Sequence, residues 1–244
     1  MMTRHSILDL GNLMMVQERE RFLSQLFQRQ GFDTLENLRA IEAGCSTGYN
    51  LRMLVQWGAH PANLAGIDVN PSATAYVGLH SPEIRTHTGS AEAIAEADES
   101  FDLSLAFTLF SSVPDDDISR GIAHELFRVT RPGGLIVVYD MRRKNPANRR
   151  VHPVLTDDIR RWFPKCPLRV RSLTLAPPIA RLTGRYAPWL YGPLSAIPLL
   201  RTHAMYVLRR PALPYYRDEP EPGPEAAVET TKSTESSESP GAEL

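Results

Sequence analysis

Residues 40–51 read AIEAGCSTGYNL, and this stretch decides the fold. Residues 38–43 form an apolar run with one acid, Glu42, near its end, which is typical of a buried strand. Gly44 and Gly48 enclose a loop of small residues, where they can adopt positive φ or let a ligand approach the backbone. The helix expected from residue 50 would present unpaired N–H groups to that ligand. The stretch predicts a strand, a ligand-binding turn and a helix, although a plain tight turn has a similar pattern.

Working outward, the chain alternates between short apolar runs and helix-like segments. The further predicted strands are residues 64–69, 84–88, 101–108, 134–141, 168–175 and 202–208. The predicted helices are residues 13–30, 50–58, 72–78, 118–129 and 157–163. Strands that alternate with helices imply a parallel sheet covered on both faces, so the sequence predicts an α/β fold.

The net charge of −1 hides an uneven distribution. Residues 218–244 carry eight acids and one base, which gives −7, whereas residues 1–217 carry +6. The acidic segment is rich in Pro, Glu, Ser and Thr and has little apolar surface to offset its ordering entropy. We predict an N-terminal helical cap at 1–36, a ligand-binding domain at 37–210 and a disordered acidic tail at 211–244.

Cysteine content and hydropathy exclude several classes of protein. Cys45 and Cys166 cannot form a disulfide scaffold for 244 residues, so we expect reduced thiols and a cytoplasmic protein. No apolar run reaches the ~20 residues of a membrane-spanning helix, and the first residues do not resemble a signal peptide. No His, Asp and Glu cluster has ligand spacing, so we expect no metal.

Asp68 closes the second predicted strand, 20 residues after Gly48. An acid at this position can accept hydrogen bonds from both hydroxyls of a ribose, although it could also cap the following helix. A dinucleotide site would need the pattern G-x-G-x-x-G. Here Ser46 and Leu51 stand where the second and third glycines would be, which weakens that interpretation.

Five motifs in the same order resemble those of the class I S-adenosylmethionine-dependent methyltransferases. The first motif, EAGCSTG at residues 42–48, is similar to the family pattern E/D-x-G-C-G-T-G, and Asp68 matches the acid that holds the cofactor ribose. The other three motifs are GSAE at residues 89–92, FDLSL at 101–105 and FRVTRPGGL at 127–135.

The resemblance implies a Rossmann-like, doubly wound and mostly parallel seven-stranded sheet with an antiparallel last strand and helices on both faces. It implies that residues 37–210 bind S-adenosylmethionine. The cofactor-binding residues that it assigns are Glu42, Gly44, Cys45, Ser46, Gly48, Asp68, Val69, Ser90, Ala91, Phe107 and Thr108. Ser46 replaces a family glycine, and Ser90 replaces an acid that accepts from adenine. A neutral hydroxyl is the weaker acceptor, so we expect weakened cofactor binding.

The methyl acceptor is expected above the ends of the fourth and fifth predicted strands. Methyl transfer is an in-line displacement in which orientation can contribute about 7–11 kcal/mol. A base is needed only where the acceptor loses a proton. Asp140 ends the fifth strand and is the candidate catalytic base, although a salt bridge to a neighbouring Arg would explain it as well. Glu42 can bond the cofactor amine or fix the loop, and the two roles are compatible.

Two further segments have more than one interpretation. Residues 142–171 carry ten bases and two acids, which fits an anionic acceptor, a nucleic acid or acidic membrane surface, or simply a solvated basic face. No nucleic-acid-binding module is recognisable, so we expect no such partner. Residues 186–201 can cap the acceptor pocket with Trp189 and Tyr191 as walls, touch a membrane surface, or pack on the sheet.

We therefore predict an S-adenosylmethionine-dependent methyltransferase that methylates an oxygen of a small-molecule or glycan-type acceptor, as in bacterial small-molecule and glycan pathways. Two alternatives stay open. One is an NAD(P)-binding oxidoreductase of similar topology. The other is a non-catalytic, methyltransferase-like binding or scaffold protein.

Overall fold

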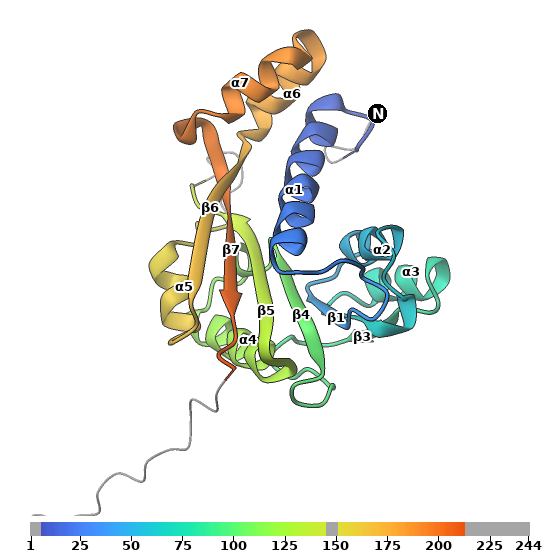
Figure 1. Ribbon diagram of the computed structural model, residues 1–244. Helices are drawn as coiled ribbons and strands as arrows, with labels where there is room; N and C mark the ends of the chain where they lie inside the picture. The colour runs from blue at the N-terminus through green and yellow to red at the C-terminus, as the bar shows by residue number, and fades with distance from the viewer. Residues whose placement is uncertain (1–5, 145–150, 213–244) are drawn as a thin grey trace, which may run out of the picture. The chain divides into compact units, whose positions relative to one another are not determined.

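The computed structural model describes residues 6–144 and 151–212 (Figure 1). Its helices are α1 (Leu10–Arg29), α2 (Tyr49–Gln56), α3 (Pro71–His80), α4 (Asp116–Val129), α5 (Thr156–Trp162), α6 (Pro177–Tyr186) and α7 (Tyr191–Ser195). Its strands are β1 (Ala40–Ala43), β2 (Leu64–Asp68), β3 (Arg85–Thr88), β4 (Phe101–Phe107), β5 (Thr130–Met141), β6 (Leu168–Leu175) and β7 (Arg201–Arg209).

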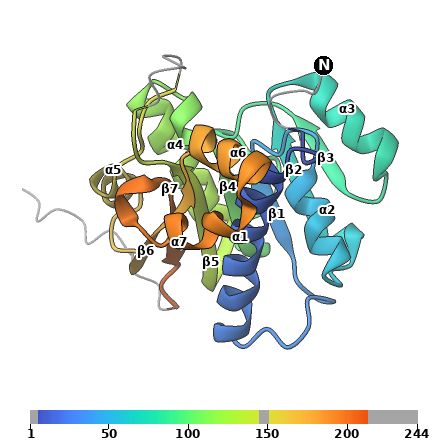
Figure 2. The same cartoon turned by 90° about the horizontal axis from the view of Figure 1, so that it is seen from above.

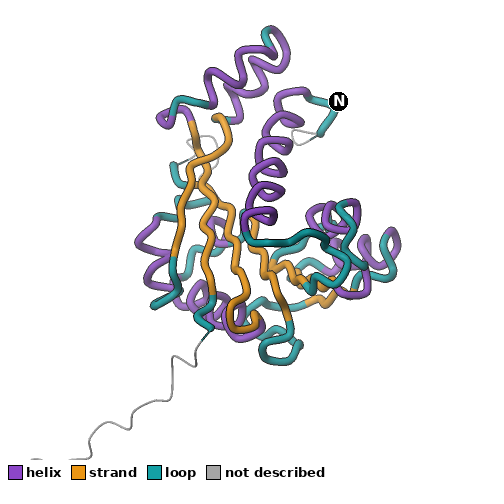
Figure 3. The backbone as a smooth tube through the Cα atoms, in the orientation of Figure 1, coloured by secondary structure: helices purple, strands orange, loops and turns teal. Residues whose placement is uncertain are grey.

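The strands, orange in Figure 3, form one seven-stranded sheet. Their order is β3-β2-β1-β4-β5-β7-β6. Strands β1 to β5 pair in parallel, and β7 runs antiparallel to both β5 and β6. The predicted sheet is therefore confirmed, including its antiparallel last strand. Strand β5 begins earlier than the predicted residue 134, because Thr130 pairs with Phe101 before a register shift.

The core lies on both faces of the sheet, as the alternation along β5 requires. Leu135, Val137 and Tyr139 join the cluster under α1 and α2, whereas Ile136 and Val138 join the cluster under α4 and α5. Figure 2 shows α1 and α2 on one side of the strands and α4 on the other. This arrangement explains why the central strands are apolar throughout.

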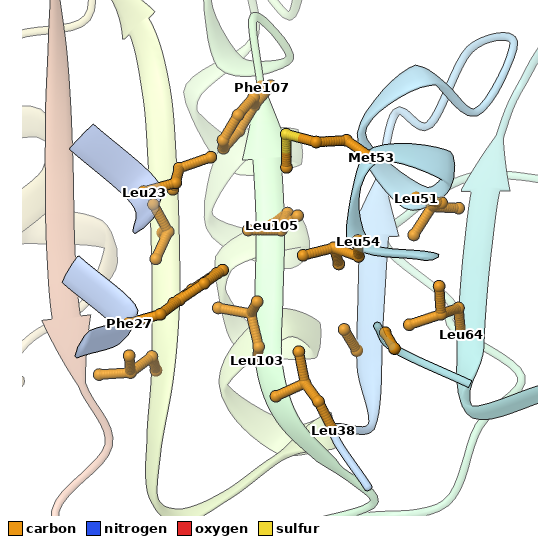
Figure 4. Close-up of a cluster of buried hydrophobic side chains, with 14 of the residues drawn as sticks. Leu23, Phe27, Leu38, Leu51, Met53, Leu54, Leu64, Leu103, Leu105 and Phe107 are labelled. Carbon is orange, nitrogen blue, oxygen red and sulfur yellow. The ribbon is translucent and has the colours of Figure 1, made fainter. Parts of the chain in front are cut away.

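Helix α1 packs into the same core as α2 (Figure 4). The Asp9 side chain caps its first turn by accepting from the Asn12 N–H at 3.0 Å. Leu23 is fully buried, and Leu26 and Phe27 are buried beside it. Burying one such side chain stabilises a fold by about 1.5–3 kcal/mol. The predicted cap at 1–36 thus contributes its helix to the core, and its standing as a separate domain stays a prediction.

Residues 177–200, which we call the tip, connect β6 to β7 and contain α6 and α7 (Figure 1). The tip packs on α1 at a close crossing of two glycines. A Cβ atom on Gly184 would lie 2.3 Å from the Gly11 backbone nitrogen, so neither position has room for a larger residue. The tip is therefore held against α1.

The predicted acidic tail lies outside the described residues apart from its first two positions. Within the described ranges, none of the helices has the length and apolar character of a membrane span. Those ranges also contain no group of three His, Cys, Asp or Glu side chains that could hold a metal ion.

Candidate active site

The loop after β1 adopts the strained backbone that its glycines predict. Gly44 and Gly48 have φ of +70° and +76°, and Ser46 between them has φ of +47°. The N–H groups of Gly44 and Cys45 donate to the Ile67 carbonyl at 2.8 and 3.1 Å, which fixes the loop to the end of β2. Left-handed conformations suit glycine and cost a non-glycine residue about 1–2 kcal/mol. Ser46 nevertheless adopts this conformation. Strained backbone conformations of this kind are common at ligand sites.

Asp68 faces this loop from the end of β2. Its carboxylate accepts from the Ser46 N–H at 2.7 Å and from the Asn70 N–H at 2.9 Å. Each carboxylate oxygen has a second lone pair, so both can still accept a hydroxyl. Val69 next to it is exposed, and the Gly89 N–H donates to the Asp68 carbonyl at 3.0 Å. The loop after β3 therefore lies beside Asp68.

Three more predicted cofactor residues lie close to this edge of the sheet. Ser90 donates its hydroxyl to Glu92 Oε2 at 3.0 Å, and Ala91 is buried. Cys45 is also buried, and burial raises the pKa of its thiol to about 12, so it is not a reactive thiolate at neutral pH. Cys45 therefore contributes packing to the loop.

Glu42 is a buried carboxyl group below the loop. Its Oε1 accepts from Asn50 Nδ2 at 2.5 Å, while Oε2 has no hydrogen-bond partner. Burial raises the pKa of Glu42 to about 8, although Asn50 and the nearby Arg19 oppose the shift. A buried carboxyl with a free oxygen is poised to pair with a cationic ligand group.

Arg19 reaches the same place from α1, and it is one of three consecutive residues, Gln17, Glu18 and Arg19, that the sequence predicts could reach the pocket, with a solvated helix face as the alternative. Its Nη2 donates to Asn50 Oδ1 at 3.1 Å, and its buried Nε has no partner. The guanidinium carbon lies 5.8, 5.3 and 5.5 Å from the ring centroids of Tyr49, Phe107 and Tyr139. Cation–π contacts therefore hold this cation at the end of β4.

One buried hydrogen-bond donor, Arg19 Nε, and one buried acceptor, Glu42 Oε2, thus lack hydrogen-bond partners near Asn50. Among the described residues, the buried side-chain polar atoms without a hydrogen bond are Arg19 Nε, Glu42 Oε2 and Ser119 Oγ. The first two are linked through the amide of Asn50. A ligand with both an ammonium and a carboxylate group would satisfy both of them, since buried polar groups are normally paired.

A second group of polar side chains lies beyond Arg19, on the side of β5, β6 and β7. Tyr139 shares a hydrogen bond with Thr174 at 2.7 Å and stacks on His203, with ring centroids 5.0 Å apart. Tyr191 of α7 donates to Glu18 Oε2 at 2.7 Å. Burial lowers the pKa of His203 to about 4, so this imidazole is neutral. Thr174 and His203 were not predicted, because nothing in their local sequence marks them.

Asp140 does not occupy the position expected of a base. Its side chain is fully buried, and its two oxygens accept from the Ser111 and Met141 N–H groups at 3.0 and 2.8 Å. Burial raises the pKa of this carboxyl group, against those hydrogen bonds. Asp140 fixes the turn after β4 to the end of β5. Within residues 6–144 and 151–212, Asp140 makes no ion pair with an Arg side chain.

Thr108 and Trp189 also have roles that differ from those expected of a pocket wall. Thr108 has φ of +53°, and its hydroxyl donates to the Phe107 carbonyl at 2.7 Å, so it shapes the turn after β4. Trp189 was expected to line the acceptor pocket, but 75% of its surface is exposed. Tyr191 is the aromatic residue of the tip that contacts α1, because its hydroxyl donates a hydrogen bond to Glu18.

The basic residues at 142–171 are partly paired within the fold. Arg161 bonds Asp116 and Asp158, each at 2.9 Å, and Arg160 bonds Asp157 at 3.0 Å. Residues 145–150 lie outside the described ranges. In the part of the segment that the structure describes, these ion pairs favour a solvated basic face.

Comparison with known proteins shows which proteins this chain is similar to. Residues 40–134 match a family model described as a methyltransferase domain. The 2-methyl-6-phytyl-1,4-hydroquinone methyltransferase of Synechocystis is 27% identical over 155 residues, 60% of this chain and 47% of that protein. A ubiquinone biosynthesis O-methyltransferase of Sinorhizobium medicae is 28% identical over 136 residues, 54% of this chain and 52% of that protein. The chain spans about half the length of these curated relatives.

A solved structure has the same fold. A proposed sarcosine dimethylglycine methyltransferase from Galdieria sulphuraria superposes with a TM-score of 0.59 at 15% identity, over 80% of this chain and 86% of that one. Residues 40–134 are therefore similar to a methyltransferase domain, and the chain shares the fold of this solved structure.

Proposed function

We propose that this protein transfers the methyl group of S-adenosylmethionine to an oxygen of a small-molecule acceptor. The observation that carries the proposal is the pair of unsatisfied buried atoms, Glu42 Oε2 and Arg19 Nε, beside the loop at 44–48. The methionine part of the cofactor has an ammonium and a carboxylate group, which complement these two atoms. A nicotinamide dinucleotide has no such pair on its ribose and diphosphate groups.

The other residues of the site fit the rest of the cofactor. Asp68 has free lone pairs for the ribose hydroxyls, and Val69 offers an exposed apolar face to the adenine ring. Ser90 is a neutral acceptor for the adenine amino group. The cofactor supplies an activated methyl group on a sulfonium, so the protein contributes mainly orientation, charge pairing and exclusion of water.

For the acceptor, we propose a phenol or hydroquinone. One curated relative is a 2-methyl-6-phytyl-1,4-hydroquinone methyltransferase, and another is an O-methyltransferase of ubiquinone biosynthesis. The stacked Tyr139 and His203 rings would complement an aromatic ring, and offset ring pairs contribute about 0.5–1.5 kcal/mol beyond their burial. Glu18 is a partly buried carboxylate on this side and is the group that we assign to proton removal from the acceptor. Glycan-type acceptors are included as the alternative in the radiolabelled-methyl screen described below.

The first experiment is a calorimetric titration with S-adenosylmethionine, S-adenosylhomocysteine and NAD(H). We expect both adenosyl ligands to bind and NAD(H) not to bind. Tight NAD(H) binding without adenosyl binding would favour the oxidoreductase alternative. Glu42→Gln should weaken adenosyl binding, whereas Glu83→Gln, in the turn before β3, should leave it unchanged.

The second experiment is a radiolabelled-methyl screen over hydroquinones, phenols and sugars. We expect label in a hydroquinone or phenol, and loss of that label in Asp68→Ala. Label in a sugar alone would reject the phenolic acceptor but keep methyl transfer. Cofactor binding without any labelled acceptor would favour the binding-protein alternative. Loss of methyl transfer in Glu18→Gln, with an unchanged dissociation constant for S-adenosylmethionine, would support its role in proton removal.

A further inference from the structure

The tip carries several large apolar and aromatic side chains that are exposed to solvent. Trp189, Leu199 and Leu182 are 75%, 69% and 60% exposed. Tyr186 and Ile197 are exposed beside them in the sequence, and all five belong to residues 177–200. We call these five side chains the apolar face.

Helix α6 is amphipathic, with Leu182 and Tyr186 of the apolar face on its exposed side. Ala180, Thr183 and Gly184 are buried on the other side of α6, and α6 crosses α1 there. Tyr191 is buried and bonds Glu18 of α1. The tip is therefore folded and anchored through its inner side, so the exposure of its outer side does not come from loose packing.

The charged residues of the tip indicate what kind of surface the apolar face would bind. Residues 177–200 contain two cations, Arg181 and Arg185, and no acid. The Arg185 guanidinium lies 5.2 Å from the Tyr186 ring. Aromatic residues beside Arg, on a helix with apolar neighbours, are typical of segments that lie in the interface of a bilayer rather than cross it. Cations next to this face are attracted by anionic headgroups.

The position of the tip adds a second reason. Helices α6 and α7 of the tip lie beyond the ends of the parallel strands (Figure 1), on the edge where β1, β4 and β5 carry the site residues. Leu8, before α1, is also exposed, and the start of α1 lies beside α6.

We propose that the apolar face is an interfacial membrane-binding site that takes an anionic bilayer surface, with Trp189, Leu199 and Leu182 entering the headgroup region and Arg185 meeting the lipid phosphates. This site is separate from the methyl-transfer chemistry. A lipid-soluble acceptor would meet the active site there, and that last consequence alone depends on the proposed function.

The test is co-sedimentation of the full chain with vesicles of phosphatidylcholine, alone or mixed with phosphatidylglycerol. We expect binding to the mixed vesicles and much weaker binding to phosphatidylcholine. The double variant Trp189→Ser with Leu199→Ser should reduce partitioning about tenfold or more, because two apolar side chains no longer enter the interface. Arg185→Gln should reduce binding less and should lower its dependence on salt.

Leu79→Ser is the matched control, because Leu79 is 77% exposed but lies on α3. It should bind vesicles as the unaltered protein does. Circular dichroism of each variant checks that the fold is retained. Absence of binding to the anionic vesicles, or equal loss in Leu79→Ser, would overturn the proposal. A concentration-dependent dimer that the double variant abolishes, without vesicle binding, would also overturn it and would assign the face to a second copy of the chain.

Discussion

The two halves of the active site are built in different ways. In the cofactor half, around β1 and β2, the key partners are close in sequence: Glu42 and Asn50 are 8 residues apart, and Ser46 and Asp68 are 22 apart. In the acceptor half, Glu18 and Tyr191 are 173 residues apart. A short segment can encode the first half as a motif, whereas only the completed fold brings the second half together.

Arg19 connects the two halves. It bonds Asn50 in the cofactor half and lies against the Tyr139 ring in the acceptor half. Because one side chain contacts both, we expect cofactor and acceptor binding to influence each other. The predictions below test whether the halves can be separated.

The largest expected effect is on the core that supports both halves. Leu23→Ala should lower the free energy of unfolding by about 2–5 kcal/mol, because it leaves a cavity between α1 and the sheet. Urea denaturation measures this, with Leu79→Ala as the exposed control. Two separate transitions, with only the smaller one shifted, would instead make residues 1–36 an independent cap.

Removing the Asp68 carboxylate should weaken cofactor binding without changing the acceptor half. Asp68→Ala should weaken S-adenosylmethionine binding by at least about tenfold, since a hydrogen bond to a charged group contributes about 1.5–3 kcal/mol. Calorimetry measures the dissociation constant, with the exposed Asp117→Ala as the control. Unchanged affinity would show that Asp68 only holds the Ser46 N–H and does not bind ribose.

The raised pKa of Glu42 gives a pH dependence with a definite sign. Relative to Glu42→Gln, the protein should lose stability as pH rises from about 4.5 toward about 8, because the unfolded carboxyl ionises first. An ammonium ligand favours the ionised form, so cofactor affinity should rise over the same window, by up to about tenfold per pH unit. Calorimetry at several pH values checks both. Equal pH profiles in the two proteins would contradict this assignment.

The smallest expected effect lies in the acceptor half. Tyr191→Phe removes the hydrogen bond to Glu18, which should cost about 1 kcal/mol. We expect a higher KM for the acceptor and an unchanged dissociation constant for the cofactor. Tyr186→Phe is the control, because Tyr186 is exposed on the same tip. A change in cofactor affinity would show that the halves are coupled through Glu18 and Arg19.

The contrast between the halves also explains which expectations were correct. The strand pattern and the glycine loop predicted the sheet, because burial between two helical layers forces apolar strands and a tight turn forces small residues. Asp140 was predicted as a base from its place at the end of a strand. Its local sequence does not show that the Ser111 N–H, 29 residues away, bonds its carboxylate in the folded chain.

By itself, the sequence determined the fold class, the order of the elements and the local motifs around Glu42 and Asp68, because each depends on residues that are neighbours along the chain. Only the tertiary structure decided that Arg19 fills the space between three aromatic rings and that Tyr191 meets Glu18. It also decided that Trp189 faces outward. The physical reason is that such contacts depend on how distant elements pack, and a helix pattern alone does not say which neighbour its side chains will find.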